Sequence, residues 1–419
     1  MSILDRDNIV ADKSFNRWMV PPAALLIHLS IGMIYGFSIF WPELTMLIGS
    51  ECSSSVTFIE RVFTTYCDWL RSDVVWTFAI AIVFLGMSAA VFGHWLEKAG
   101  PRKAGFAAAV TWGGGLMIAS IGISLHQLWL IWIGAGVIGG IGLGLGYISP
   151  VSTLIKWFPD RRGLATGMAI MGFGGGAMIG MPLGDSLISA YGVAQTFFIM
   201  GIIYFIAMTI GAFGYRVPAN GWKPKNWNPS ITKTTNMISK NHVHVGVAHK
   251  TPQFWLLWGV LCLNVSAGIG VLSVAKPMFQ EIAASSFDPL IIGAIATGFG
   301  ALLSLANIIG RIFWASSSDF LGRKLTYAIF FSLGTALYLA APWAGLNQYI
   351  AAFVVITLVI LTMYGGGFAT IPAYLADIFG TQHVGAIHGR LLTAWSLAGI
   401  IGPMLISYLR EYQLALGIP

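Results

Sequence analysis

The sequence predicts an all-α protein whose helices cross a membrane. Only 9% of its 419 residues are charged, whereas soluble domains carry roughly 25%. The mean hydropathy is +0.77, and several apolar runs reach the roughly 20 residues that a helix needs to cross a bilayer. The 51 glycines suit the close helix packing of membrane proteins. These observations exclude a soluble globular fold.

Apolar segments justify eleven spans, taken in chain order. Polar turns separate the second from the third (Glu97–Lys103), the fourth from the fifth (Asp160–Arg162) and the eighth from the ninth (Asp319–Lys324), and a long polar segment follows the sixth (Arg216–Lys250). The expected limits are 18–41, 74–96, 104–124, 128–156, 164–190, 194–214, 253–280, 290–315, 325–344, 349–375 and 386–408.

The distribution of charge predicts the orientation of these spans. The segment after the sixth span has no acidic residue but contains Arg216, Lys223, Lys225, Lys233, Lys240 and Lys250. Lys and Arg mark the cytoplasmic side, and all basic turns fall on one side if the N-terminus is cytoplasmic. The N-terminal segment lacks the basic region of a cleavable signal peptide. The net charge of +7 therefore reflects topology, and no nucleic-acid partner is expected.

Two cysteines lie in the long loop that follows the first span. On an oxidising face of the membrane, Cys52 and Cys67 could form a disulfide, and two free thiols are the alternative. Cys262 lies inside a span, where packing is the expected role.

An internal repeat divides the chain. The turns GHWLEKAGPRK (93–103) and ASSSDFLGRK (315–324) place an acid, then a glycine three positions later, before basic residues. The two acids, Glu97 and Asp319, are 222 positions apart, as are Gly163 and Gly385 in KWFPDRRGLATG and DIFGTQHVGAIHGR. We therefore expect two copies of a roughly six-helix unit. The expected limits are a cytoplasmic N-terminus (1–17), an N-terminal bundle (18–214, with an outer loop, 45–73), a cytoplasmic linker (215–252) and a C-terminal bundle (253–419).

The paired turns resemble the signature of the major facilitator superfamily. KWFPDRRGLATG (156–167) and TPQFWLLW (251–258) look like its oxalate/formate antiporter branch, which neighbours the monocarboxylate transporters. The resemblance covers nearly the whole chain and implies two pseudo-symmetric six-helix bundles, alternating access and a substrate site near the midplane. It also implies a gating role for Gly93, Glu97, Lys98, Arg102, Asp319, Arg323 and Lys324. Because LREYQLALGIP follows the eleventh span, we expect the last of twelve helices, a peripheral one, to be missing by truncation.

Arg311 is the main candidate for substrate binding. It precedes Asp319 by eight residues, so it lies about 12 Å deeper along a helix, where an ionisable side chain usually faces a cavity or a partner. Gly300, Ser304, Asn307 and Arg311 share one helix face. The alternative is structural: an arginine bound to backbone carbonyls or to Asp319. The N-x-x-x-R spacing resembles monocarboxylate transporters, in which the arginine pairs with the substrate carboxylate, and Asn307 would be its neutral neighbour.

The resemblance also implies an aromatic lining for the site. The residues that look like the lining of the oxalate carrier's cavity are Tyr35, Tyr147, Phe173, Tyr364, Phe368 and Trp395. Packing against lipid or core is the alternative for each. Oxalate carriers have a lysine where Trp395 falls, so this chain has one deep cation. Lys276 lies near the outer end of its span, where a gating or interface role is expected. One cation favours a monoanion over oxalate.

Proton coupling has two candidates, His28 in the first span and Asp185 near the outer end of the fifth. A histidine in a helix can instead be a packed hydrogen-bonding residue, and an exchanger needs no proton carrier. G-x-G patterns in 139–146 lie within a span, which excludes a dinucleotide loop. No enzyme, cofactor or metal site is expected, and HVHVG (242–246) fits a linker that could bind metal adventitiously.

The sequence thus predicts a secondary carrier of small monocarboxylates (lactate, pyruvate or formate type), acting as a monomer in a bacterial-type plasma (inner) membrane by proton symport or anion exchange. An oxalate/formate-type dicarboxylate antiporter is the first alternative. A carboxylate sensor that kept the fold but lost transport is the second.

Overall fold

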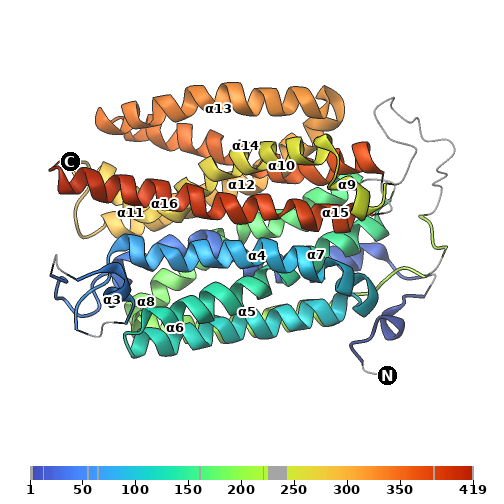
Figure 1. The fold of residues 1–419 in the computed structure, drawn as a ribbon, viewed down its shortest axis with the longest axis horizontal. Helices are drawn as coiled ribbons and strands as arrows, with labels where there is room; N and C mark the ends of the chain where they lie inside the picture. Colours follow the sequence, from blue (N-terminus) through green and yellow to red (C-terminus); the bar gives the residue numbers. More distant parts are fainter. Residues whose placement is uncertain are drawn as a thin grey trace.

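The computed structural model describes residues 3–12, 14–53, 56–63, 66–159, 162–219, 221–224, 243–380 and 383–417, except for the side chains of 162–166. Long helices lie side by side, with α4, α5 and α7 in the lower half of the view in Figure 1 and α10, α12, α13 and α14 in the upper half. Lys225, Lys233, Lys240 and His242 of the linker, and Asp160 of the turn before the fifth span, lie outside the described residues.

Ten helical stretches within the described part of the chain are long and apolar enough to span a membrane. They are Arg17–Ile39 (α1, Val20–Gly32, and the tighter turns of η3, Met33–Ile39), Arg71–Ala99 (α4), Pro101–Ser124 (α5), Leu128–Trp157 (ending in α7, Gly139–Trp157), Gly167–Gly214 (within α8, Arg162–Gly214), Pro252–Ser273 (α10), Ile292–Leu321 (α12), Arg323–Leu346 (α13), Ile350–Phe379 (α14) and Val384–Ala415 (α15, Val384–Leu391, and α16, Thr393–Ala415). Two short helices, α3 (Phe58–Phe63) and α11 (Ala275–Ala283), follow the first span and α10.

Helix α8 contains two of the predicted spans. A straight α-helix of its 53 residues would be about 80 Å long, far more than the roughly 30 Å of a bilayer core. Gly192 breaks the helix with φ 79° and ψ 167°. A Cβ built on Gly180 would lie 3.1 Å from the hydroxyl of Tyr204, so the segments before and after Gly192 run antiparallel. The predicted spans 164–190 and 194–214 are therefore two antiparallel helices joined at Gly192.

The 222-residue interval recurs in the backbone. Gly100 separates α4 from α5 with φ 89° and ψ 160°, and Gly322 separates α12 from α13 with φ 86° and ψ 147°. Both angles favour glycine because a side chain is strained at positive φ. The helices that follow, α5 and α13, each have 24 residues. We call the end of the bundle that carries these two turns the basic-loop face.

The opposite end carries the loop after the first span, and we call it the disulfide-loop face. Cys52 and Cys67 form a disulfide there. The carboxylate of Asp68 accepts hydrogen bonds from the backbone N–H groups of residues 48–50 at 2.7–3.0 Å. Arg61 of α3 binds Asp73 at the start of α4 at 2.7 Å, and this hydrogen bond raises the pKa of Arg61. The loop is thus attached to α4.

Close helix crossings depend on glycine. A Cβ on Gly113 of α5 would lie 2.7 Å from the backbone oxygen of Gly201 in α8, and a Cβ on Gly201 would lie 2.8 Å from that of Gly113. Backbone atoms on the facing helix have little room to move. The two helices therefore approach each other only because both positions lack a side chain.

Gly113→Ala should lower the melting temperature in detergent, because overpacking costs roughly 1–3 kcal/mol. Gly114→Ala is the matched control, since a Cβ on Gly114 meets no atom within 4 Å, and alanine stabilises an exposed helix interior by about 0.5–1 kcal/mol relative to glycine. The control should melt at or above the wild-type temperature. Equal melting temperatures for the two variants would contradict the close crossing.

Candidate functional site

Arg311 lies fully buried on the face of α12 that packs against α8. Its Nε donates to Oδ1 of Asn307 and its Nη1 donates to the carbonyl of Ile170, both at 2.9 Å. Two turns before Arg311, Ser304 donates to the carbonyl of Gly174 at 2.6 Å. The polar stripe predicted on this helix therefore faces α8, where the first and second copies of the repeat meet.

If Arg311 were purely structural, its guanidinium would bind either backbone carbonyls or Asp319, and the structure shows which of the two it contacts. A backbone carbonyl does bind the guanidinium, at Ile170. Asp319 does not; it accepts from Arg323 at 2.6 Å. In the described part of the chain Arg311 has no ion pair, and its Nη2 has no hydrogen-bond partner. Neutral oxygens thus bind Nε and Nη1 of the guanidinium, while Nη2 is buried without a hydrogen-bond partner.

Six buried aromatic side chains gather around Arg311, and we call them the aromatic cluster: Tyr35 (η3), Tyr147 (α7), Phe173 (α8), Tyr364 and Phe368 (α14) and Trp395 (α16). The centre of the guanidinium lies 5.5 Å from the ring centroid of Phe368 and 6.0 Å from that of Phe173, which permits cation–π attraction.

The cluster is continuous. The Trp395 ring lies 4.4 Å from Phe368, 5.2 Å from Phe173 and 5.4 Å from Tyr147, centroid to centroid. The hydroxyl of Tyr364 donates to that of Tyr35 at 2.6 Å. All six side chains are buried within the protein, so none of them packs against lipid. In this conformation they pack against one another in the core.

Several unpaired hydrogen-bond donors lie close together in and beside this cluster. Four buried groups have no partner among the described residues: Nη2 of Arg311, Nδ2 of Asn307, Oη of Tyr147 and Nε1 of Trp395. Leaving a buried polar group unsatisfied costs about 1–3 kcal/mol, and more for a charged group. Every one of these groups can donate a hydrogen bond, so a small anion is the kind of ligand that would satisfy them.

His28 packs against the same cluster. Its ring stacks on Tyr147 with centroids 5.5 Å apart. Its two nitrogens face backbone carbonyls, Nδ1 that of Ala169 and Nε2 that of Tyr147, the latter at 3.2 Å. A neutral imidazole has a single N–H, so in that form it donates to one of these two carbonyls.

Asp185 and Lys276 form an ion pair toward the disulfide-loop face, with Nζ and Oδ1 2.7 Å apart. The pair joins α8 to α11. Nearby, Trp41 donates its indole N–H to the carbonyl of Ser273 at 2.6 Å. Lys276 therefore does not supply a second free cation to the Arg311 site, and Asp185 already has a partner. The sequence placed both residues near the outer ends of their spans, but it did not indicate that they pair.

A second set of contacts crosses the disulfide-loop face. Glu281 of α11 accepts from Arg71 of α4 at 2.7 Å and from Arg410 of α16 at 2.8 Å. The Arg71–Glu281 and Asp185–Lys276 pairs close this end of the interface between the two copies of the repeat, whereas Arg410 and Glu281 both belong to the second copy.

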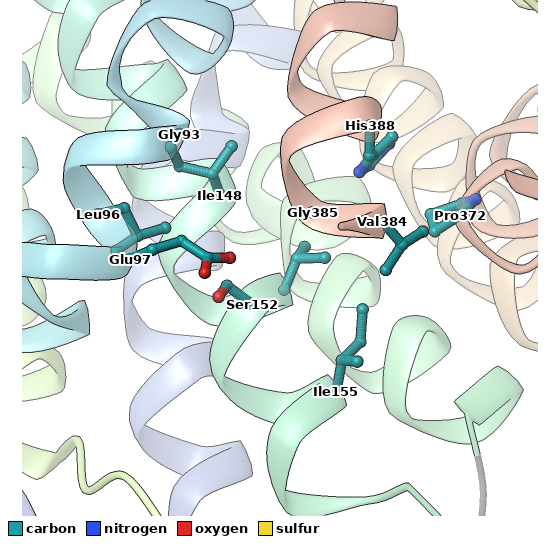
Figure 2. Close-up of a pocket in the computed structure, with 11 residues that line it drawn as sticks. Gly93, Leu96, Glu97, Ile148, Ser152, Ile155, Pro372, Val384, Gly385 and His388 are labelled. Atoms are coloured by element: carbon teal, nitrogen blue, oxygen red, sulfur yellow. The ribbon is translucent and has the colours of Figure 1, made fainter. Parts of the chain in front are cut away.

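A pocket opens at the other end of that interface, and we call it the basic-loop pocket. Its lining comes from α4, α7, α14 and α15 and comprises Gly93, Leu96, Glu97, Ile148, Val151, Ser152, Ile155, Pro372, Val384, Gly385 and His388. Figure 2 shows Glu97 and His388 on opposite sides of it. His388 was missed by the sequence analysis, because a single histidine near a helix start carries no distinctive pattern.

The remaining residues of the paired turns lie around this face. Arg102 donates to the carbonyls of Ile3 and Phe213 at 2.9 and 3.1 Å. Arg323 binds both Asp319 and Asp377, the latter at 3.1 Å. Lys98 and Lys324 are exposed. The two turns thus brace neighbouring helices in different ways.

Comparisons with known proteins agree with this architecture. Residues 17–403 match the model of the Major Facilitator Superfamily. The chain is 25% identical over 387 residues to an uncharacterized MFS-type transporter, YhjX, of Escherichia coli K12 (92% of this chain, 86% of the relative). It is 25% identical over 393 residues to the oxalate:formate antiporter of Oxalobacter formigenes (92% and 83%). It is 23% identical over 306 residues to monocarboxylate transporter 12 of Xenopus laevis (70% and 65%).

The matched region includes every residue of the Arg311 site and of the aromatic cluster. The chain is accordingly a multi-pass membrane protein and not an enzyme, and it belongs to the major facilitator superfamily of secondary transporters.

Proposed function

We propose that this protein carries small monocarboxylates across the membrane by alternating access. The observation that carries the proposal is that Nη2 of the buried Arg311 and Nδ2 of Asn307 beside it have no hydrogen-bond partner among the described residues. Guanidinium presents two parallel N–H groups that match a carboxylate, and charge-assisted pairs of this kind are about twice as strong as neutral hydrogen bonds. The substrate carboxylate would take the place that no protein acceptor fills.

The number of charges supports a monoanion. Arg311 is the only cation among the described residues of the cluster, and Trp395 falls where oxalate carriers resemble this chain but have a lysine. A monocarboxylate would neutralise the site, whereas oxalate would leave one negative charge in a space of low dielectric. At an effective dielectric of about 20, such a charge is worth several kcal/mol. The tight aromatic packing also favours a small substrate.

The contacts at the two ends support an alternating cycle. Two ion pairs, Arg71–Glu281 and Asp185–Lys276, close the disulfide-loop face, while the basic-loop pocket opens on the other side. A substrate that enters from this pocket would reach Arg311, and the helices would then exchange which face is closed. Opening the disulfide-loop face requires the Asp185–Lys276 pair to separate, so we assign this pair the role of a gate.

The remaining parts of the proposal follow from the sequence. The basic-loop face would be cytoplasmic, with the N-terminus (1–17) and linker (215–252) on that side, and the bundles 18–214 and 253–419 would move relative to each other. We place the protein in a bacterial-type plasma membrane as a monomer, with proton symport or anion exchange as the mode. The similarity to an oxalate:formate antiporter over 92% of this chain favours dicarboxylate exchange as the second candidate.

Uptake into proteoliposomes tests the function. Labelled lactate, pyruvate and formate should each be offered with and without a pH gradient, and at least one should accumulate. A transport-inactive sensor would bind these acids without taking them into the vesicles.

Arg311→Lys should reduce uptake at least about tenfold, since losing one charge-assisted hydrogen bond of roughly 1.5–3 kcal/mol corresponds to a factor of ten or more. The lysine keeps the charge but loses the fork. Melting temperature and membrane insertion serve as controls for folding. Near-normal uptake by this variant would show that the arginine is structural.

Trp395→Lys should move selectivity toward oxalate, because the added ammonium supplies the second positive charge that a dianion needs. Competition by lactate and by oxalate against labelled lactate, measured on wild type and variant, gives the ratio of affinities. In the wild type lactate should compete at least tenfold better. Tighter oxalate binding by the wild type would overturn the monoanion assignment and support the dicarboxylate alternative.

Asp185→Asn should open the disulfide-loop face, because it leaves the buried ammonium of Lys276 without its partner. A cysteine in place of the buried Ser38, whose hydroxyl lies 3.4 Å from the backbone nitrogen of Lys276, reports this opening through alkylation by an impermeant maleimide. Labelling should rise several-fold and return to the starting rate in the charge-exchanged pair D185K/K276D. Equal labelling in all three proteins would remove the gate assignment.

A further inference from the structure

His388 is a buried histidine with an open nitrogen at the inner wall of a pocket. Its side chain is 3% exposed, and its Nε2 has no hydrogen-bond partner among the described residues. The ring lines the basic-loop pocket beside Val384 and Gly385 of α15, and Figure 2 shows it on the side of the pocket across from Glu97. A titratable group in this position borders a pocket on one side of the protein.

The same ring lies next to the Arg311 site. Its centroid is 6.2 Å from that of Tyr147. Tyr147 in turn contacts Trp395 and Phe173 of the aromatic cluster, and its hydroxyl is unpaired. A short series of side chains thus connects the basic-loop pocket, through His388 and Tyr147, to the site where Arg311 would hold an anion.

We propose that His388 exchanges the proton that accompanies the substrate between the basic-loop pocket and the Arg311 site. This rests on the proposed function, since it assigns the proton of a monocarboxylate symport. The step is the addition of one proton to a neutral imidazole, which gives an imidazolium. Each loaded protein then gains one positive charge on His388 and one negative charge in the substrate, so loading is electroneutral.

Neither other candidate for this proton, His28 or Asp185, lines the basic-loop pocket. Asp185 is paired with Lys276 toward the opposite face. In the part of the chain that the structure describes, no carboxylate binds Arg311. His388 lines that pocket, and its Nε2 has no hydrogen-bond partner among the described residues.

The charged groups around His388 are compatible with protonation. Across the pocket, α4 presents Glu97, whose negative charge favours the imidazolium, and α7 presents Tyr147, which is neutral. On α14, Asp377 is bound by Arg323. On α15 itself, Arg390 is directed to the carbonyl of Val245 and to His249, at 3.1 and 2.9 Å. Among described side chains, the negative charge of Glu97 is therefore the one that faces the open ring.

His388→Gln tests the proposal, because glutamine keeps a polar side chain of similar size but does not titrate. The readout is the ratio of labelled lactate uptake with an imposed pH gradient to uptake without one. The ratio should exceed one in the wild type and fall to about one in the variant. His94→Gln is the matched control, since His94 is an exposed histidine of α4, and it should keep the wild-type ratio. An unchanged ratio in His388→Gln, or no gradient effect in the wild type, overturns the proposal while lactate transport itself stands.

A second measurement does not depend on transport. Diethyl pyrocarbonate reacts with neutral imidazole, and mass spectrometry of the wild-type protein in nanodiscs reports each histidine separately. His388 should react, more slowly as the pH is lowered, while His28 stays protected. If His94 reacts fully and His388 does not, the pocket does not give protons access to this ring and the proposal fails. If lactate, pyruvate and formate all fail to enter vesicles while His388 reacts as expected, the proposed substrate fails and the proton site remains.

Discussion

The unpaired end of a buried guanidinium is the feature on which the interior of this protein depends. Taking an isolated charge out of water costs many kcal/mol unless polar groups replace the lost hydration. Here Asn307 and the carbonyl of Ile170 supply two hydrogen bonds from neutral groups, and two aromatic faces lie within cation–π range. These contacts stabilise the charge without neutralising it. The guanidinium still attracts an anion, because no carboxylate of the described residues forms an ion pair with it.

This arrangement requires both copies of the repeat. Arg311 and Asn307 come from α12, the carbonyl that holds the guanidinium comes from α8, and the surrounding rings come from five different elements. A ligand that binds Arg311 therefore contacts helices on both sides of the interface at once. That is the geometry in which occupancy can alter the relative positions of two bundles, since the ligand's differential affinity for the two states is what shifts their equilibrium.

The sequence predicted the parts of this picture that depend on composition and on local spacing. Apolar runs located the spans, because polar groups are costly in lipid in any protein and membrane-spanning helices are therefore apolar. The interval of 222 located the repeated turns, and the conformations of Gly100 and Gly322 show the same repeat in the backbone. Arg311 was identifiable because a charge inside an apolar run has few explanations, and its aromatic neighbours were identifiable through family resemblance.

What the sequence did not contain were pairings between distant residues. Asp185 and Lys276 were each singled out, one as a proton carrier and the other as a gate, yet their 2.7 Å contact depends on how α8 and α11 dock. His388 gave no signal, because its significance comes from the pocket beside it and from Tyr147, 241 positions earlier. The break at Gly192, by contrast, falls between the predicted limits 164–190 and 194–214.

The ion pairs of Glu281 have a consequence for the surroundings in which the protein works. Arg71, Arg410 and Glu281 are each about a quarter to a third exposed, so dissolved ions reach them, and at 0.15 M salt the Debye length is only about 8 Å. Salt on that side weakens the Arg71–Glu281 contact, which joins the two copies of the repeat and must break when the disulfide-loop face opens. A higher ionic strength in the compartment that this face meets therefore lowers the free energy of opening it, through side chains that do not contact Arg311.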